Sequence, residues 1–360
     1  MRNYRRLQGF GPVQTKFTLL VALISLLLTS VARADMVPGL HAATVPVDGQ
    51  GDAALASASR DALAQVVVKV SGSSDALRHP VIVEALPEAR SHVQQYAFLR
   101  DDAPEATLQA RFEFDDSYVN RLLREAGLPL WTANRPRVLV WVAAERDGQR
   151  QLISTFDTPD LAARLMREFE RRGVPAQLPL FDLRDATAIS VDDVWAQQAG
   201  AITSASERYD VEHILAGRVV EASTGTWAGD WSYISDAGRL DRSASGVDAS
   251  TFMRQGVDMV AEDMAARYAV AFTGGADDQV LLVVTGVYSF ADYATLIEWL
   301  ERLELIEHAN IQSIANDRIE IGLETAVDAT QLATIINLNE RLQPQPLPGE
   351  SGALVYQWLN

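Results

Sequence analysis

Carboxylate and histidine side chains are the groups of this sequence that could hold a metal ion. Glu84, Glu88 and His92 follow one another at intervals of four residues, a spacing that aligns them on one face of a helix. Pro87 interrupts that helix, so we interpret the three side chains as a solvated face. A second acidic cluster lacks the ligand spacing of an EF-hand loop. It consists of Asp182, Asp185, Asp192 and Asp193.

A glycine-rich segment is similar to a phosphate-binding loop. Residues 49–54 (GQGDAA) match G-x-G-x-x-A, in which glycines let the backbone approach a pyrophosphate at a helix N-terminus. Pro46 lies in the preceding strand, Asp52 would face the phosphate, and no second mononucleotide-binding half follows. We therefore interpret these residues as a turn followed by the N-cap of a helix. The chain has no cysteine, which excludes disulfides and thiolate sites, and we expect no metal and no other cofactor.

The sequence gives little support to catalysis. Neither G-x-S-x-G nor S-x-x-K is present, and a turn at a helix C-terminus explains the serine-rich residues 71–74. The 48 acidic residues offer many carboxylate pairs. A glycosidase, however, needs two carboxylates roughly 5 to 9.5 Å apart across a cleft, and a sequence does not supply that distance. We predict that the protein is not an enzyme.

Aromatic side chains are the strongest indication of a binding surface. Trp227 and Trp231 are four residues apart in a predicted strand, which places them on one face of it. Burial in a core is the commoner outcome for such side chains, whereas exposed ones would form an interaction patch. If any of these side chains are exposed, we expect them to be Trp227, Trp231 and Tyr233. The candidate interaction surface consists of Trp195, Tyr209, Trp227 and Trp231.

The first 34 residues are typical of a secretory signal peptide. A positively charged stretch, an apolar run over residues 17–31 and small residues at Ala32 and Ala34 follow one another in that order. The apolar run is shorter than the roughly 20 residues of a membrane-spanning helix. We predict cleavage after Ala34, a periplasmic location and no membrane span in the mature chain.

The charge of the chain excludes some partners. The predicted signal peptide has five of the 31 basic residues and none of the 48 acidic ones, so the mature chain has a net charge of about −22. Binding to nucleic acid depends mainly on neutralising phosphates, and adsorption to anionic lipid also requires positive charge. We therefore expect neither partner.

Turn signals and hydrophobic patterns predict an α+β fold of three small mixed α/β domains, over residues 35–134, 135–273 and 278–360. In the first we predict strands at 42–47 and 107–114 and helices at 52–70, around 81–96 and after a cap at Asp115 or Asp116. In the second we predict strands at 138–143, 177–181, 214–221, 226–235 and 239–245, and helices at 158–173, 191–199, 201–209 and 249–268.

The third segment has the element order of a ferredoxin-like domain. A strand at 280–287 precedes a helix capped by Ser289, and a hairpin at 309–324 precedes a second helix, from Asp328 through Leu342. A last strand at 354–358 completes the order β-α-β-β-α-β.

The mature chain resembles an uncharacterised exported family of proteobacteria, known only as domain of unknown function 2066. The segments with the resemblance are 65–72 (QVVVKVSG), 127–131 (GLPLW), 135–141 (RPRVLVW), 178–182 (LPLFD), 205–209 (ASERY) and 215–219 (LAGRV), with Trp227 and Trp231. The element order of the middle segment looks like the TolB N-terminal domain and similar modules of envelope assembly proteins. The resemblance implies no catalytic residues and no substrate.

These observations favour a non-catalytic periplasmic protein that acts as a binding or scaffolding module for other cell-envelope components. The alternative is a binding protein for a small molecule or glycan, with its site in a cleft between the first and second segments. An envelope hydrolase is the third hypothesis.

Overall fold

The computed structural model describes residues 34–99, 108–272, 279–303, 305–325, 327–338, 341–345 and 353–359. The predicted signal peptide up to residue 33, the start of the strand predicted from residue 107 and the break predicted after residue 273 lie outside these ranges. Within the described ranges, no helix has the length and apolar character needed to cross a membrane. The chain is a mixed α/β protein, as predicted, with strands paired in sheets of two, three, five and six.

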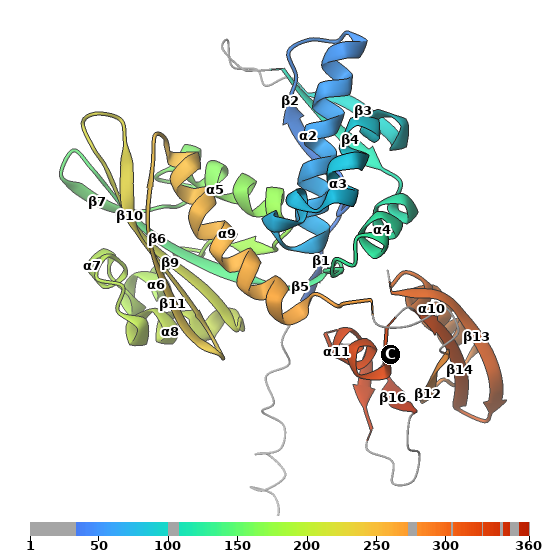
Figure 1. The fold of residues 1–360 in the computed structure, drawn as a ribbon. Helices are drawn as coiled ribbons and strands as arrows, with labels where there is room; N and C mark the ends of the chain where they lie inside the picture. The colour runs from blue at the N-terminus through green and yellow to red at the C-terminus, as the bar shows by residue number, and fades with distance from the viewer. Residues whose placement is uncertain are drawn as a thin grey trace, which may run out of the picture. The chain divides into compact units, whose positions relative to one another are not determined.

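The N-terminal segment contains a three-stranded antiparallel sheet and a long helix (Figure 1). The strands lie in the order β2 (Ala42–Pro46), β4 (Gln109–Phe114) and β3 (Val93–Leu99), and α2 (Asp52–Ser71) packs against them. Leu63, Val66 and Val70 have no exposed surface, which confirms the predicted apolar face of α2. The helix ends at Gly72, whose φ of 78° is in the left-handed region that favours glycine.

The helix predicted around residues 81–96 is wrong beyond its first turns. The chain forms η1 (Ser74–Arg78), α3 (Pro80–Ala85) and η2 (Leu86–His92), and then enters strand β3. Pro87 has no amide hydrogen and restricts the residue before it, which explains why the α-helix does not continue. The next helix, α4 (Asp116–Glu125), begins as predicted, because the carboxylate of Asp115 accepts a hydrogen bond from the Tyr118 amide at 2.8 Å.

Arg135 joins the N-terminal segment to the central one. It lies in β5 (Asn134–Pro136), which pairs with β1 (Ala34–Met36), and it has no exposed surface. Its guanidinium donates to the carbonyl oxygens of Lys69 at 2.9 Å and Gly173 at 2.8 Å, at the C-termini of two different helices. It also stacks over the Trp131 ring at 3.8 Å. A buried cation thus supplies hydrogen-bond donors to carbonyl oxygens that have no partner within their own helices. Its charge also interacts favourably with the negative ends of both helix dipoles.

The central segment forms a six-stranded sheet in the order β11-β10-β9-β6-β7, with β8 (Ala176–Gln177) also paired to β6. β6 (Val138–Arg146) and β9 (His213–Glu221) are parallel, whereas β7 (Gln149–Leu152), β10 (Trp227–Ser235) and β11 (Gly238–Gly246) pair antiparallel. The strand predicted at 177–181 is wrong, because only residues 176 and 177 pair. Pro179 has no amide hydrogen for a ladder, and Phe181 has a φ of 53°.

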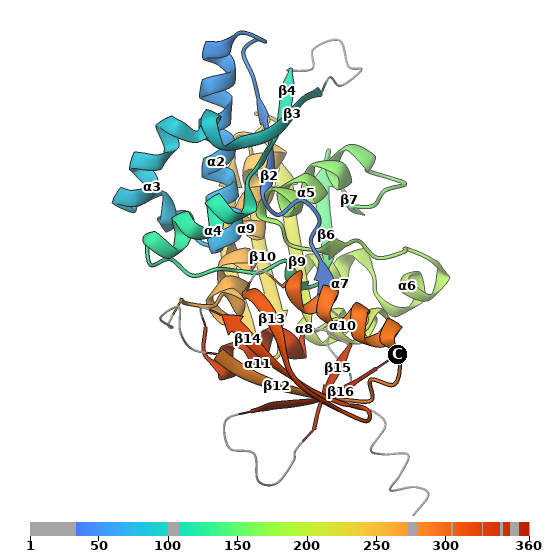
Figure 2. The same ribbon diagram turned by 90° about the vertical axis from the view of Figure 1, so that its right-hand side faces the viewer.

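Helices cover both faces of the central sheet (Figures 1 and 2). α5 (Pro159–Arg172) and α9 (Ala249–Tyr268) pack on one face, and α6 (Leu183–Ala188), α7 (Val191–Trp195) and α8 (Ala199–Ser206) pack on the other. Successive residues of β6 point alternately into the two cores, with Val140 in the first and Trp141 in the second. Because both faces are covered, β6 is apolar at every position from 138 to 144, which includes the apolar run predicted at 138–143.

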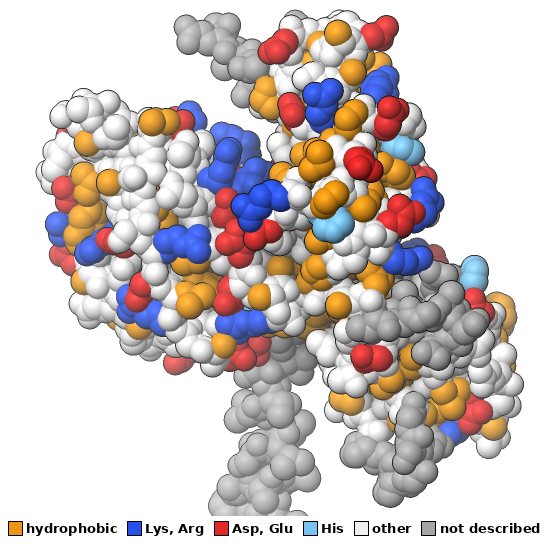
Figure 3. All heavy atoms as spheres, viewed as in Figure 1, with side chains coloured by type: hydrophobic (Ala, Val, Ile, Leu, Met, Phe, Trp, Pro, Cys, Tyr) orange, Lys and Arg blue, Asp and Glu red, His pale blue; other side chains and the backbone are white. Residues whose placement is uncertain are grey.

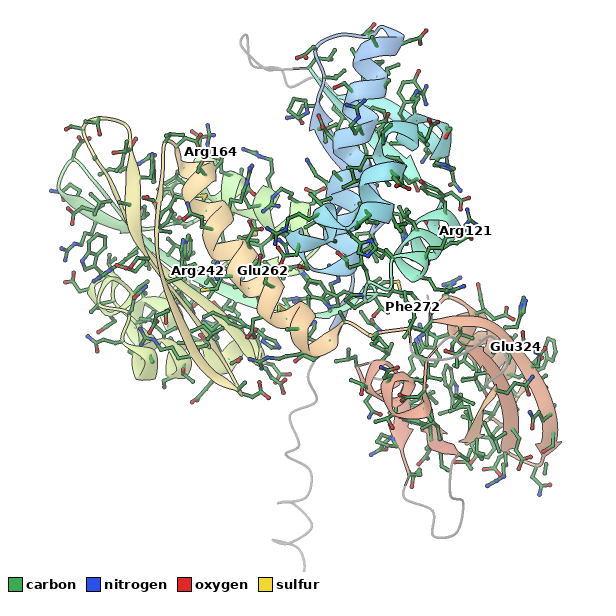
Figure 4. The ribbon with its side chains drawn as sticks, viewed as in Figure 1. Arg121, Arg164, Arg242, Glu262, Phe272 and Glu324 are labelled. Carbon is green, nitrogen blue, oxygen red and sulfur yellow. The ribbon has the colours of Figure 1, made fainter. Side chains whose placement is uncertain are left out.

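Charged side chains lie where α5 and α9 approach the end of α2. Arg172 of α5 pairs with Asp258 of α9 at 3.0 Å and donates to the Gly72 carbonyl at 2.7 Å. Basic and acidic side chains gather in this region in Figure 3. Glu262, labelled in Figure 4, extends from α9 and accepts a hydrogen bond from Ser74 at 3.5 Å. These contacts bridge the two segments beside Arg135.

The C-terminal segment is a five-stranded sheet with two helices. β13 (Ile306–Ala315), β14 (Arg318–Thr325), β12 (Gln279–Thr285), β16 (Leu354–Trp358) and β15 (Leu342–Pro344) lie in that order, with α10 (Phe290–Glu301) and α11 (Ala329–Asn337) in the connections. The prediction that the second helix includes Leu342 is wrong. Leu342 begins β15, where it pairs with Trp358.

Candidate functional site

Two of the four predicted interface residues, Trp227 and Trp231, lie in the hydrophobic core. Trp227 is 4% exposed and Trp231 is fully buried, as is Tyr233, so the choice of these three side chains as the most exposed aromatics is wrong. Trp231 stacks on Phe252 of α9, with ring centroids 5.0 Å apart. The predicted strand face is present, but α9 covers it.

Trp195 and Tyr209 lie on the opposite face of the central sheet, where both are half-buried. Trp195 ends α7, and the Arg150 guanidinium lies 4.2 Å from the centre of its ring. Tyr209 ends η3 (Glu207–Tyr209), directly after α8. The structure therefore separates the predicted surface into two buried residues on the α9 face and two accessible ones on the face with α6, α7 and α8.

Tyr209 fixes the loop before α6. Its hydroxyl donates to the Asp185 carboxylate at 2.5 Å and accepts from the Leu180 amide at 2.9 Å. Asp185 is 2% exposed and also accepts from the Phe181 amide at 2.8 Å. Burial, followed by the hydrogen bond to Asp185, raises the pKa of the Tyr209 hydroxyl to about 12. Tyr209 therefore stays protonated at physiological pH and keeps its donor role.

Arg208 completes this network from the same turn. Its guanidinium pairs with Asp182 at 2.6 Å and with Asp185 at 2.9 Å. Asp182 caps α6 by accepting from the amides of Arg184 and Asp185. The Arg208 hydrogen bond is the main cause that holds the pKa of Asp182 well below its usual range. Ion pairs therefore tie the loop before α6 to the end of α8.

The network holds apolar side chains in solvent. Leu180 is 61% exposed and Leu183 is 80% exposed, although the backbone around them is hydrogen-bonded at residues 180, 181, 184 and 185. Phe181 between them has a φ of 53°, a conformation that costs a residue other than glycine roughly 1–2 kcal/mol. Fixed polar contacts thus maintain a strained loop that exposes Leu180, and Leu183 is exposed directly after it as the first residue of α6.

Two hollows lie on the same face as the loop. The first, of about 260 Å³, is lined by Phe181 and Val191 among others, and the second, of about 330 Å³, by Trp195 and Val220. Val191 and Trp195 are the two ends of α7, which separates them by about 6 Å along the helix axis. The Arg218–Asp230 ion pair, at 2.8 Å, borders the second hollow. We define the docking surface as Leu180, Leu183, Val191, Trp195 and Tyr209.

The sequence singled out Trp195 and Tyr209, which the structure places on this face, but it did not indicate the exposed leucines or Arg208. The segments LPLFD and ASERY, 23 residues apart, contain most of the network, and the structure brings them together. The turn-favouring Pro179 was the one local signal against the strand predicted over Leu180. The pairing of Arg208 with Asp182 depends on the tertiary fold.

The other groups singled out in the sequence have structural roles. Asp193 makes a capping box with Ser190 at the start of α7, and Asp192 pairs with Arg150 at 3.4 Å. The His92 ring stacks on Tyr118 at 3.5 Å. Gly51 is the N-cap of α2, as the turn interpretation predicted. In the described part of the chain, no group of three or more histidine, aspartate or glutamate side chains is placed to hold a metal ion.

A family model, Domain of unknown function (DUF8605), matches residues 34–132. This finding corrects the resemblance to domain of unknown function 2066, because the match is to a different family and covers only the N-terminal segment. No curated protein matches the chain. The crystal structure of the urea amidolyase of K. lactis is similar over 70% of this chain, with 9% identity and a TM-score of 0.17. The match spans 23% of that enzyme and is too weak to indicate a shared fold.

Proposed function

We propose that this protein is a non-catalytic binding module of the periplasm that docks another envelope protein on the surface formed by Leu180, Leu183, Val191, Trp195 and Tyr209. The observation that supports this function most directly is the exposure of Leu180, on a hydrogen-bonded loop, and of Leu183, the first residue of α6. Exposed apolar groups beside hollows are typical of protein interaction sites. The export of the mature chain through a cleavable signal peptide is part of the same proposal.

The ordered backbone around Leu180 is the physical argument that this surface binds a partner and that the exposure of its leucines is not incidental. A flexible loop loses conformational entropy when a partner orders it, which weakens binding. The backbone amides of Leu180 and Phe181 donate hydrogen bonds to Tyr209 and Asp185, which fix this backbone before any partner arrives. A partner that accepts the leucines in an apolar pocket would therefore gain their burial at little ordering cost.

The two hollows favour a protein as the partner. They lie at the two ends of α7 and have volumes of about 260 and 330 Å³. Both volumes are at or below the lower end of the range of roughly 300–1,000 Å³ for small-molecule sites, and two separate hollows suit the apolar side chains of a protein better than one ligand. Interfaces concentrate their binding energy in such buried anchors, with tryptophan and tyrosine prominent among them.

The finer fold assignments belong to this proposal. The order β13-β14-β12-β16 supports a ferredoxin-like C-terminal domain, although β16 is parallel to β12 and a further strand, β15, lies at the edge. Sheet and helix order in the central segment support a module similar to the TolB N-terminal domain. Both architectures serve many functions, so neither identifies a partner.

Site-specific photocrosslinking in cells tests the docking surface. A photoreactive amino acid replaces Leu183 in the full chain, and the matched control replaces Val247, which is 77% exposed outside the surface. We expect position 183 to give a discrete adduct with one envelope protein that position 247 does not give. The change Trp195→Ala should reduce this adduct. The same adducts in the same yield from both positions would contradict the proposal.

A further inference from the structure

A second cleft, which shares no lining residue with the docking surface, lies between the N-terminal segment and α5. Its volume is about 570 Å³, and it is lined by the chain between β1 and β2, by the ends of α2 and α5 and by β4. The chain leading into β2 runs past α5 in Figure 2. Met166 and Phe169 contribute apolar surface, and Lys69 and Arg111 contribute positive charge.

Lys69 is a buried ammonium group with few partners. It is 6% exposed, and its Nζ donates to the Ala42 carbonyl oxygen at 2.7 Å. An ammonium has three donors, and within the described residues Lys69 makes no ion pair. Burial, and then the charge of Arg135, lower its pKa to about 8, while Glu170 opposes that shift. The protein thus holds an ammonium group in a site that makes its charge less favourable than in water.

Arg111 is a second cation in the same cleft. It is half-buried in β4, close enough to Lys69 to lower the lysine pKa further. No hydrogen bond or ion pair links its guanidinium to the parts of the chain that the structure describes. The guanidinium packs against Gly39, which has a φ of 63°. A side chain at this position would displace it, because a Cβ there would lie 2.5 Å from one of its nitrogens. Gly173 similarly leaves room for the Lys69 side chain, whose Cγ would lie 2.8 Å from a Cβ.

The charge balance of the cleft selects the ligand class. Lys69 and Arg111 contribute two positive charges and Glu170 one negative charge, which leaves a net charge of one. One carboxylate neutralises this charge and supplies acceptors for donors of both cations, whereas a doubly charged phosphate would exceed it. The apolar lining accommodates a hydrocarbon body. We propose that this cleft binds a small organic carboxylate, with its carboxylate between Lys69 and Arg111 and its apolar body against Met166 and Phe169.

The scarcity of lysine makes this proposal directly measurable. Lysine occurs only at positions 16 and 69 of the 360 residues, so the full chain labelled with [¹³Cε]lysine gives two side-chain resonances. The variant Lys69→Met assigns them. Titration with sodium hexanoate should shift the Lys69 resonance to saturation and raise its pKa above about 8, because a bound anion favours the charged amine.

Variants and ligand analogues distinguish this site from general charge effects. Arg111→Gln should weaken hexanoate binding about tenfold, which corresponds to one lost ion pair. The control Arg78→Gln removes an exposed arginine outside the cleft and should leave binding unchanged. A Lys69 resonance that does not respond to millimolar hexanoate, or responds equally to hexylamine, would overturn the proposal. Tighter binding of hexyl phosphate would overturn the assignment of a carboxylate.

Discussion

Replacement of Gly256 by alanine should destabilise the protein, although alanine is the better helix former. Gly256 lies in the middle of α9, where alanine alone would contribute about 1 kcal/mol. A Cβ at this position would lie 2.4 Å from both Cδ2 and Cε2 of Trp231. The indole cannot move away, because its opposite edge packs against Gly217 of β9. That contact is so close that a Cβ on Gly217 would lie 2.4 Å from the ring. Trp231 is therefore wedged between two glycines.

The expected magnitude follows from two opposing effects. Overpacking of a rigid core costs roughly 1–3 kcal/mol, and the fused ring held from both sides places Gly256→Ala near the upper end. Subtraction of the helix propensity gain leaves a net loss of about 2 kcal/mol in the free energy of unfolding. Urea denaturation monitored by far-UV circular dichroism measures it.

Gly200→Ala is the matched control for this substitution. Gly200 lies in α8, and a Cβ there would meet no heavy atom within 4 Å. The control should therefore stabilise the protein by up to about 1 kcal/mol. If Gly256→Ala stabilises the protein as Gly200→Ala does, then α9 does not close on Trp231 as described, and the argument for its burial fails.

Two further predictions concern the contributions of buried His213 and buried Arg135 to stability. His213 lies between the hydroxyls of Tyr233 and Tyr268, at 2.7 and 3.2 Å, and burial lowers its pKa from 6.5 to about 4. As the pH falls, the unfolded chain binds a proton at His213 before the folded protein does. The free energy of unfolding should therefore be unaffected by this group above pH 6.5 and should fall by up to about 3 kcal/mol as the pH drops to 4. His213→Gln should remove this pH dependence, as measured by urea denaturation at several pH values. Arg135→Met leaves helix-end carbonyls unsatisfied and should cost about 4 kcal/mol by the same assay, whereas equal stability of this variant and Arg78→Met would contradict the capping role.

The local elements could largely be predicted from the sequence. Pro159 at the first turn, Asp160 beside it and Gly173 at the end indicate α5, and the structure has this helix over Pro159–Arg172. The hairpin of the C-terminal segment turns at Asn316, whose φ of 59° suits asparagine. In these cases the signal lies within a few residues of the element.

The errors arise where tertiary contacts decide. The spacing of Trp227 and Trp231 correctly predicts a common strand face, but the sequence does not reveal which helix covers that face. Burial of Trp231 depends on Gly217 and Gly256, which belong to different elements. The docking surface likewise depends on the pairing of Arg208 with Asp182 across 26 residues. Such contacts join residues far apart in the sequence. Hydrogen bonds to a loop also leave no periodic hydrophobic pattern from which they could be predicted.

Removal of one oxygen atom tests the central proposal most directly. In the photocrosslinking assay at Leu183, the background variant Tyr209→Phe removes the hydroxyl that holds Leu180 and Asp185, and it leaves both leucines and the ring in place. If a preordered loop recognises the partner, the yield of the specific adduct should fall several-fold while the melting temperature changes little. An unchanged adduct in this background would contradict recognition by the ordered loop, and with it the proposed docking function.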